Sequence, residues 1–312
     1  MNTSRRRFLK QSTLAVSGSL LLSNALLAGT TASRSFVGLQ LYSVRDDMKK
    51  DPAGTLKQLA AMGYTHVEHA GYEDRKFYGY EPAAFKKLLA DLGLIMLSGH
   101  SFVGADIWNK KENDFTDSWK HTVEDAAMVG MQYVISPGVD ESLCKKEDDF
   151  KWYLQLYNKT GELCKKSGIQ FAYHNETFEF NHYLNKKRIY DLLLDGTDKS
   201  LVAQQIDIGN MYPSGGRGMD YLKRYPGRFF SMHVKDEIKS NTHDEGFESC
   251  VLGKGIVGTK EILAFARQQG SIRQYIIEQE SYGDQTPLAC AKDDLAMMKQ
   301  WGFWSFICPA DR

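Results

Sequence analysis

A unit of helix, glycine and short apolar strand recurs along this chain, and the repeat constrains the fold more than any other feature. Gly63, Gly93, Gly130 and Gly168 each separate a stretch of helical periodicity from a short apolar run, at spacings of 30, 37 and 38 residues. Glycine readily adopts the left-handed conformation that ends a helix. Short apolar strands that alternate with helices indicate a parallel sheet.

The sequence contains eight strand candidates in this alternating pattern. They are Phe36–Val44, His66–Glu68, Ile95–Gly99, Tyr133–Ser136, Gln170–His174, Ala203–Ile208, Phe229–Val234 and Tyr275–Glu280. Eight such units predict an α/β fold, a single (β/α)8 TIM barrel over residues 33–312. A doubly wound open sheet is the alternative, but no GxGxxG segment follows the first strand.

The first 32 residues have the layout of a secretory signal. A basic head, Ser4–Lys10, precedes a mildly apolar stretch and a run of small residues. The head resembles the twin-arginine export signal S-R-R-x-F-L-K, which implies a periplasmic or exported protein. A basic amphipathic helix is the alternative, disfavoured because no acidic residue precedes Asp46. The apolar stretch is too short and interrupted for a good membrane span, so we expect no stable membrane insertion after cleavage.

Charge and cysteine content exclude several classes of protein. The chain has 39 basic and 39 acidic residues; the leader holds four of the basic and none of the acidic ones, so its removal leaves a net charge of −4. A mildly acidic protein is a poor fit to a nucleic-acid partner, whose phosphates attract basic surfaces. Five scattered cysteines without a CxxC pair indicate neither a zinc ribbon nor a disulfide framework.

Polar side chains follow most of the predicted strands. In a barrel, the carboxyl ends of the strands carry the chemistry. Removing a charge from water costs several kcal/mol unless the charge is paired or coordinated, so a bound cation is one economical way to satisfy these groups. The candidate site residues are Gln40, Tyr42, Glu68, His100, His174, Glu176, Asp207, Asn210, His233, Lys235 and Glu278.

The ends of the last four strands resemble the xylose-isomerase-like barrel superfamily, in particular the sugar phosphate isomerase/epimerase group. They read Tyr173-His174-Asn175-Glu176, Gln205-Ile206-Asp207-Ile208-Gly209-Asn210, Met232-His233-Val234-Lys235-Asp236 and Ile276-Ile277-Glu278-Gln279-Glu280. The superfamily includes sugar isomerases, ketose 3-epimerases, inosose dehydratases and endonuclease IV. The resemblance extends to the opening Gly38–Arg45 and to Asp220–Arg228.

This resemblance implies one divalent metal held at the ends of the fifth to eighth strands. The corresponding ligands are His174, Asp207, His233 and Glu278. In the sugar epimerases the first ligand is a glutamate, so either His174 takes this position or Glu176 reaches it; we favour His174. Two imidazoles and two carboxylates suit Mn²⁺, Zn²⁺, Co²⁺ or Fe²⁺ better than the oxygen-preferring Mg²⁺ and Ca²⁺.

The resemblance further implies an isomerase or epimerase acting on a sugar or polyol through a metal-stabilised enediolate. The expected catalytic residues are Glu278, Glu176, His100 and Lys235, and the expected substrate-binding residues are Gln40, Tyr42, Glu68 and Asn210. Ketose epimerases use two metal-bound glutamates, of which only Glu278 is kept here. A lyase or hydrolase acting on a keto-sugar or 3-keto-glycoside is therefore the alternative. Further alternatives are a non-catalytic carbohydrate-binding barrel and an endonuclease IV-like nuclease, which would need a three-zinc cluster.

Overall fold

Eight parallel strands close into a barrel in the computed structural model, which describes residues 35–304. They are β1 (Phe36–Gln40), β2 (His66–His69), β5 (Ile95–His100), β8 (Tyr133–Pro137), β9 (Gln170–His174), β12 (Val202–Asp207), β13 (Phe229–Val234) and β16 (Gln274–Ile277). Neighbours in the barrel follow chain order, and β16 closes it against β1. The predicted TIM barrel is confirmed and the open sheet is wrong. The predicted signal peptide lies outside the described residues.

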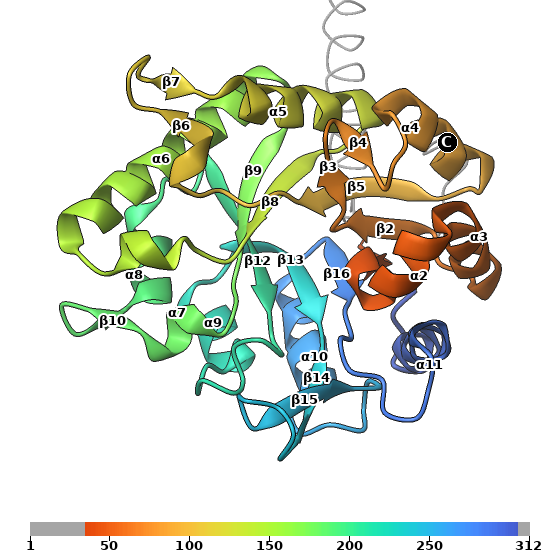
Figure 1. Ribbon diagram of the computed structural model, residues 1–312. Coiled ribbons are helices and arrows are strands. Elements are labelled where there is room, and N and C mark those ends of the chain that lie inside the picture. The colour runs from red at the N-terminus through yellow and green to blue at the C-terminus, as the bar shows by residue number, and fades with distance from the viewer. Residues whose placement is uncertain (1–34, 305–312) are drawn as a thin grey trace, which may run out of the picture. The chain divides into compact units, whose positions relative to one another are not determined.

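Helices follow the strands and cover the outside of the barrel (Figure 1). The longer ones are α3 (Pro52–Met62), α4 (Pro82–Asp91), α5 (Asp117–Val129), α6 (Glu147–Lys166), α8 (Ile189–Gly196), α10 (Thr259–Gln269) and α11 (Pro287–Gln300). Shorter ones are α2 (Arg45–Lys50), α7 (Phe178–Asn181), α9 (Gly218–Arg224) and the 3-10 turns η1 (Leu41–Val44), η2 (Ala105–Ile107) and η3 (Glu141–Cys144). Fully buried side chains such as Leu59, Phe85 and Leu263 form the core between helices and strands. Within the described part of the chain, no helix combines the length and apolarity needed to cross a membrane.

The repeated glycines end helices as the sequence predicts. Gly63 follows α3 with a φ of 101°, and Gly130 follows α5 with a φ of 100°. A side chain at this φ would be strained, so glycine sets the point where each helix stops and the next strand begins. At the other end of α3, the Asp51 side chain accepts a hydrogen bond from the Gly54 amide and caps the helix.

Two barrel strands are shorter than predicted. The first ends at Gln40, because the Gln40 side chain accepts a hydrogen bond from the Tyr42 amide and the chain turns into η1. The last ends at Ile277, so Glu278 and Glu280 lie just beyond the strand. Both differences place polar side chains on loops at the mouth of the barrel rather than within its wall.

Four short antiparallel hairpins rise from the loops around the barrel. They are β3 (Tyr72–Glu73) with β4 (Lys76–Phe77), β6 (Trp108–Asn109) with β7 (Asp114–Phe115), β10 (Tyr183–Leu184) with β11 (Lys187–Arg188), and β14 (Asp236–Lys239) with β15 (Phe247–Cys250). The last hairpin begins next to Lys235. The Asp236 carboxylate accepts hydrogen bonds from the amides of Gly253, Gly255 and Val257, which fixes the loop after the hairpin.

Candidate active site

A cavity of about 790 Å³ opens at the carboxyl ends of the strands. Its floor includes His100, His174 and Glu278, and its walls come from the segments after β1, β2, β5, β9 and β16 and from the start of α5. Tyr42, a predicted substrate contact, lines the cavity and is exposed. The cavity thus lies where a TIM barrel carries its chemistry.

The four predicted metal ligands converge at the inner end of this cavity. His174, Asp207, His233 and Glu278 each offer one ligand atom, and these atoms all lie within 4.8 Å of one another. The four side chains come from β9, β12, β13 and the segment just after β16. All four are buried, so the cluster is shielded from bulk water.

Asp207 presents one oxygen to this cluster and uses the other as an anchor. Its Oδ1 accepts hydrogen bonds from the amides of Gly209 and Asn210, at 2.7 and 2.8 Å. Its Oδ2 is buried, has no hydrogen-bond partner, and lies 3.6 Å from His233 Nδ1 and 3.9 Å from His174 Nε2. Burial alone would raise the pKa of Asp207, but Lys235 and the neighbouring histidines hold it well below its usual range. Asp207 is therefore ionised, and its Oδ2, which has no hydrogen-bond partner, is available to coordinate a metal.

His233 is held by a carboxylate on each side of its ring. Its Nε2 lies 2.6 Å from Glu68 Oε1, and its Nδ1 lies 3.1 Å from Glu278 Oε2. Burial opposes a charge on the ring, but Glu278 and Glu68 outweigh burial and raise the pKa of His233 well above its usual range. With Nε2–H donated to Glu68, the nitrogen that faces the other ligand atoms is Nδ1. A carboxylate behind a histidine in this way orients it for a metal.

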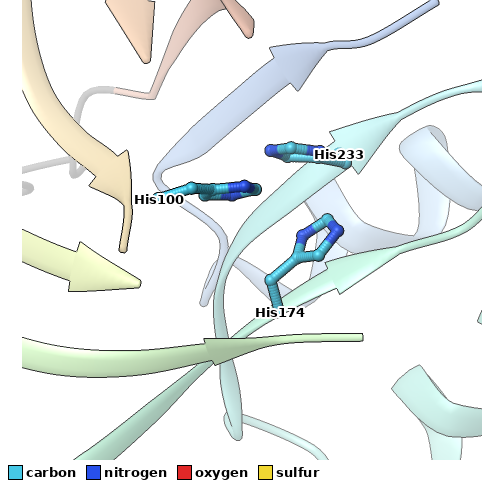
Figure 2. A group of neighbouring side chains, drawn as sticks. All are labelled: His100, His174 and His233. Carbon is cyan, nitrogen blue, oxygen red and sulfur yellow. The ribbon is translucent and has the colours of Figure 1, made fainter. Parts of the chain in front are cut away.

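His174 and His100 share one amide partner. His174 Nδ1 lies 2.9 Å from Gln205 Oε1, and His100 Nε2 lies 3.0 Å from the same oxygen. The amide oxygen can only accept, so both rings donate to it and His174 keeps Nε2 towards Asp207. Burial lowers the pKa of His174, and the neighbouring His233 and His100 lower it further, so the ring is neutral. Figure 2 shows the three imidazoles gathered around one point.

A second group of polar side chains lies beside the cluster. Lys235 forms an ion pair with Glu280 and donates to Asn210 Oδ1 at 2.6 Å, with Glu278 Oε2 at 3.7 Å. Asn210 also donates to Glu176 Oε2 at 2.7 Å. Lys235 thus pairs with Glu280 rather than with its sequence neighbour Asp236.

Glu176 lines the cavity outside the four-atom cluster. Its Oε1 lies 3.6 Å from His174 Nε2. Desolvation at the recessed wall raises the pKa of Glu176 to about 8; Lys235 opposes this, and Glu278 adds to it. Of the two candidates for the fifth-strand ligand, His174 is the one in the cluster.

The positions of Gln40 and Glu68 do not match the prediction that these residues bind substrate. Both are fully buried beneath the cavity and do not line it. Gln40 donates to Glu68, which also accepts hydrogen bonds from Ser98 Oγ at 2.5 Å and from Gln205 Nε2 at 3.0 Å. Burial would raise the pKa of Glu68, but His233 and His100 hold it well below its usual range. These residues support the histidines from below.

The sequence interpretation did not identify Gln205 or Ser98. Gln205 Nε2 donates to Ser231 as well as to Glu68, and Ser98 Oγ also lies 3.1 Å from Gln274 Oε1. Together with Gln40 and Glu68 these side chains form a polar layer inside the barrel, built from six strands. The available signal was a glutamine pair, Gln204-Gln205, within a strand whose other residues before Asp207 are apolar.

The donor set fits a divalent transition metal. The ligand atoms would be His174 Nε2, Asp207 Oδ2, His233 Nδ1 and a Glu278 oxygen. Two imidazole nitrogens and two carboxylates are typical of Mn²⁺, Fe²⁺, Co²⁺ and Zn²⁺ sites. The unpartnered Asp207 Oδ2 is the kind of buried atom that a cation would satisfy.

Curated relatives of this chain are inosose dehydratases. It is 24% identical to one from Bacillus licheniformis over 265 residues. This alignment covers 77% of this chain and 86% of the relative. It is 28% identical over 109 residues to one from Clostridium perfringens, and there the match spans 35% of this chain and about a third, 36%, of the relative.

Among solved structures, this chain is similar to a sugar phosphate isomerase/epimerase from Parabacteroides distasonis. The identity is 27% and the TM-score 0.70, over 85% of this chain and 98% of that one. Residues 56–301 match the xylose isomerase-like TIM barrel family, which is most of the chain. The cavity, with its histidines and carboxylates from consecutive strands, lies at the strand ends of this barrel, and this chain belongs to the xylose isomerase-like TIM barrel family.

Proposed function

We propose that this protein is a metal-dependent enzyme that moves a proton on the carbon beside a carbonyl of a sugar or polyol, as in an isomerisation or epimerisation. The observation that carries the proposal is the convergence of His174, Asp207, His233 and Glu278 within 4.8 Å at the inner end of a large cavity. A divalent metal held there would polarise the substrate carbonyl and stabilise the negative charge that develops on its oxygen.

The side chains around the cluster can hold and move the proton. Glu278 lines the cavity and is the carboxylate best placed to take it from the substrate. Glu176, on the cavity wall, is the group that would return it. Lys235 lies within 3.7 Å of Glu278 and, through Asn210, is linked to Glu176, so it keeps both carboxylates in place. His100 lines the cavity and is fixed by Gln205, which suits it to orient a substrate hydroxyl.

A second candidate is elimination or hydrolysis on a keto-sugar or keto-glycoside. The observation that favours it is that His174, and not a glutamate, occupies the fifth-strand position of the cluster, which leaves Glu176 outside the ligand set. A carboxyl group that is not a ligand can protonate a leaving oxygen after Glu278 has taken the α-proton. The similarity to inosose dehydratases also supports elimination as the second candidate.

Proton exchange with solvent tests the first step that both candidates share. The purified protein is treated with chelator, reloaded separately with Mn²⁺, Zn²⁺, Co²⁺ or Fe²⁺, and incubated in D₂O with a panel of ketoses, inososes and 3-keto-glucosides. Deuterium should enter at a carbon beside the carbonyl with at least one metal, and new products distinguish epimerisation from elimination.

Two variants make this test specific. Glu278→Gln should lower exchange by at least 100-fold, because general-base catalysis contributes roughly 10²–10⁴-fold. Glu162→Gln, an exposed glutamate on α6, is the matched control and should exchange like the wild type. Exchange that does not depend on metal, or that survives in Glu278→Gln, would reject the proposal.

We also propose that the protein is exported by the twin-arginine route and acts in the periplasm. The support is the Ser4–Lys10 head and the weakly apolar stretch that follows it.

A further inference from the structure

The cavity continues well beyond the metal cluster. Its inner end holds His174, Glu176 and Glu278; its far end lies between the β3–β4 hairpin, the segment 101–107 and the start of α5. We call this far end the side arm and define it by Glu73, Asp74, Phe102, Asp106, Trp119 and Thr122. Sites that enclose drug-sized ligands measure roughly 300–1,000 Å³. At about 790 Å³, the whole cavity has room for more than the one ring that the cluster can hold.

The charge of the side arm selects against phosphorylated groups. Among the described residues that line the cavity are six carboxylates, three of them in the side arm, and neither lysine nor arginine. A phosphate in the side arm, away from the metal cluster, would meet repulsion without a basic side chain to bind it. Carboxylates are instead strong acceptors for hydroxyl hydrogen bonds, and an uncharged sugar presents several hydroxyls at once.

Phe102 gives the side arm an exposed aromatic face on a fixed backbone. Its exposed fraction is 47%, and it lines the cavity. The next residue is held on both sides: the Val103 amide donates to Ser136 Oγ at 3.0 Å, and the Val103 carbonyl accepts from Tyr153 at 2.5 Å. An exposed apolar ring can pack against the carbon–hydrogen face of a sugar. Because the backbone beside it is already held in place, binding costs little further backbone conformational entropy.

The opposite wall of the side arm is anchored as firmly. Asp125 is a buried carboxylate on α5, and it accepts hydrogen bonds from Tyr72 at 2.7 Å and from two nitrogens of Arg75 at 2.7 and 3.0 Å. These contacts fix the turn of the β3–β4 hairpin, which presents Glu73 and Asp74 to the cavity. Both walls are therefore positioned before any ligand binds.

We infer that the side arm is a second sugar subsite and that the substrate is an uncharged glycoside with at least two sugar rings. The reacting ring lies at the metal cluster, and this part rests on the proposed function. The second ring lies against Phe102, with its hydroxyls donating to the carboxylates of Glu73, Asp74 and Asp106.

Binding of unreacted sugars tests the subsite separately from the reaction. The purified protein, supplied with Zn²⁺, is titrated calorimetrically with glucose, with glucose 6-phosphate, and with maltose, cellobiose and trehalose. At least one disaccharide should bind tenfold or more tightly than glucose, and glucose 6-phosphate should bind no better than glucose. Phe102→Ala should reduce the disaccharide-to-glucose affinity ratio by at least fivefold, and Phe102→Trp should restore it.

The same titrations include a control variant and give the results that would reject the second subsite. Tyr183→Ala removes an exposed aromatic ring outside the cavity and should leave the ratio unchanged. The subsite is rejected if every disaccharide binds no more tightly than glucose, or if Phe102→Ala keeps the wild-type ratio. Failure of the proposed reaction looks different: the affinity ratio persists while no keto-sugar exchanges deuterium.

Discussion

Replacing Glu68 by glutamine should weaken metal binding although Glu68 is not a ligand. Its Oε1 lies 2.6 Å from Nε2 of His233, whose other nitrogen faces the cluster. The amide keeps the shape of the side chain but removes the negative charge behind the histidine. Carboxylates in this position contribute about 10–100-fold to metal affinity, so we expect a loss within that range.

The same substitution should destabilise the metal-free protein. Glu68 is fully buried and accepts hydrogen bonds from Gln40, Ser98, Gln205 and His233. Glutamine would present an NH₂ group to some of these donors and leave the positive charge on His233 with one carboxylate fewer. Breaking a buried ion pair costs roughly 3–5 kcal/mol, which is the expected loss in the free energy of unfolding.

Competition with a chromophoric chelator gives the metal affinity, and urea unfolding of the chelator-treated protein gives the stability. Ser98→Ala is the matched control, because it removes one hydrogen bond to the same carboxylate without changing its charge. It should cost roughly 1.5–3 kcal/mol and leave the metal affinity nearly unchanged, since Ser98 makes no hydrogen bond to His233. If folded Glu68→Gln protein binds metal as tightly as the wild type, Glu68 does not orient His233.

Three further predictions concern other parts of the chain. His174→Ala should lower metal affinity by more than about 100-fold and Glu176→Ala by less than about tenfold; chelator competition would contradict the ligand assignment if the order were reversed. Burial raises the pKa of Asp294 to about 7. The folded state then holds a proton that the unfolded chain releases near pH 4, so stability falls as pH rises from about 4 to 7, by up to about 4 kcal/mol. Asp294→Asn should reduce the loss of stability between pH 5 and pH 8 in urea unfolding, and an unchanged loss would exclude Asp294 as a contributor. Replacing Arg5 and Arg6 by lysine should stop export, and cell fractionation that still finds the protein in the periplasm would refute the twin-arginine reading.

The sequence was sufficient to predict the barrel because the fold depends on a repeated pattern. Helix-stopping glycines followed by short apolar runs indicate the strands, and side chains near the carboxyl ends of barrel strands gather towards its mouth. Many polar side chains share that position, and the resemblance to the xylose-isomerase-like superfamily selected His174, Asp207 and His233 among them; the structure brings these three together.

Depth within the barrel could not be predicted in the same way. Alternation along a strand indicates which face a side chain is on, but not whether it ends at the cavity or below it. Gln40 and Glu68 point inward as expected, yet lie under the histidines. The side arm depends on the short β3–β4 hairpin, whose two-residue strands carry almost no periodic signal. Its position is set by the distant contact between Arg75 and Asp125.

The polar layer under the cluster also has a consequence for how the barrel assembles. Gln40, Glu68, Ser98, Gln205, Ser231 and Gln274 satisfy one another across six strands. A strand that paired one residue out of register would turn its member of this layer outward to the helices, because side chains alternate between the two faces. The partners would then remain inside without hydrogen bonds, and a stranded Glu68 charge alone costs several kcal/mol. An apolar interior would tolerate such a slip far better. The polar layer therefore favours the native strand register when β16 pairs with β1 and the barrel closes.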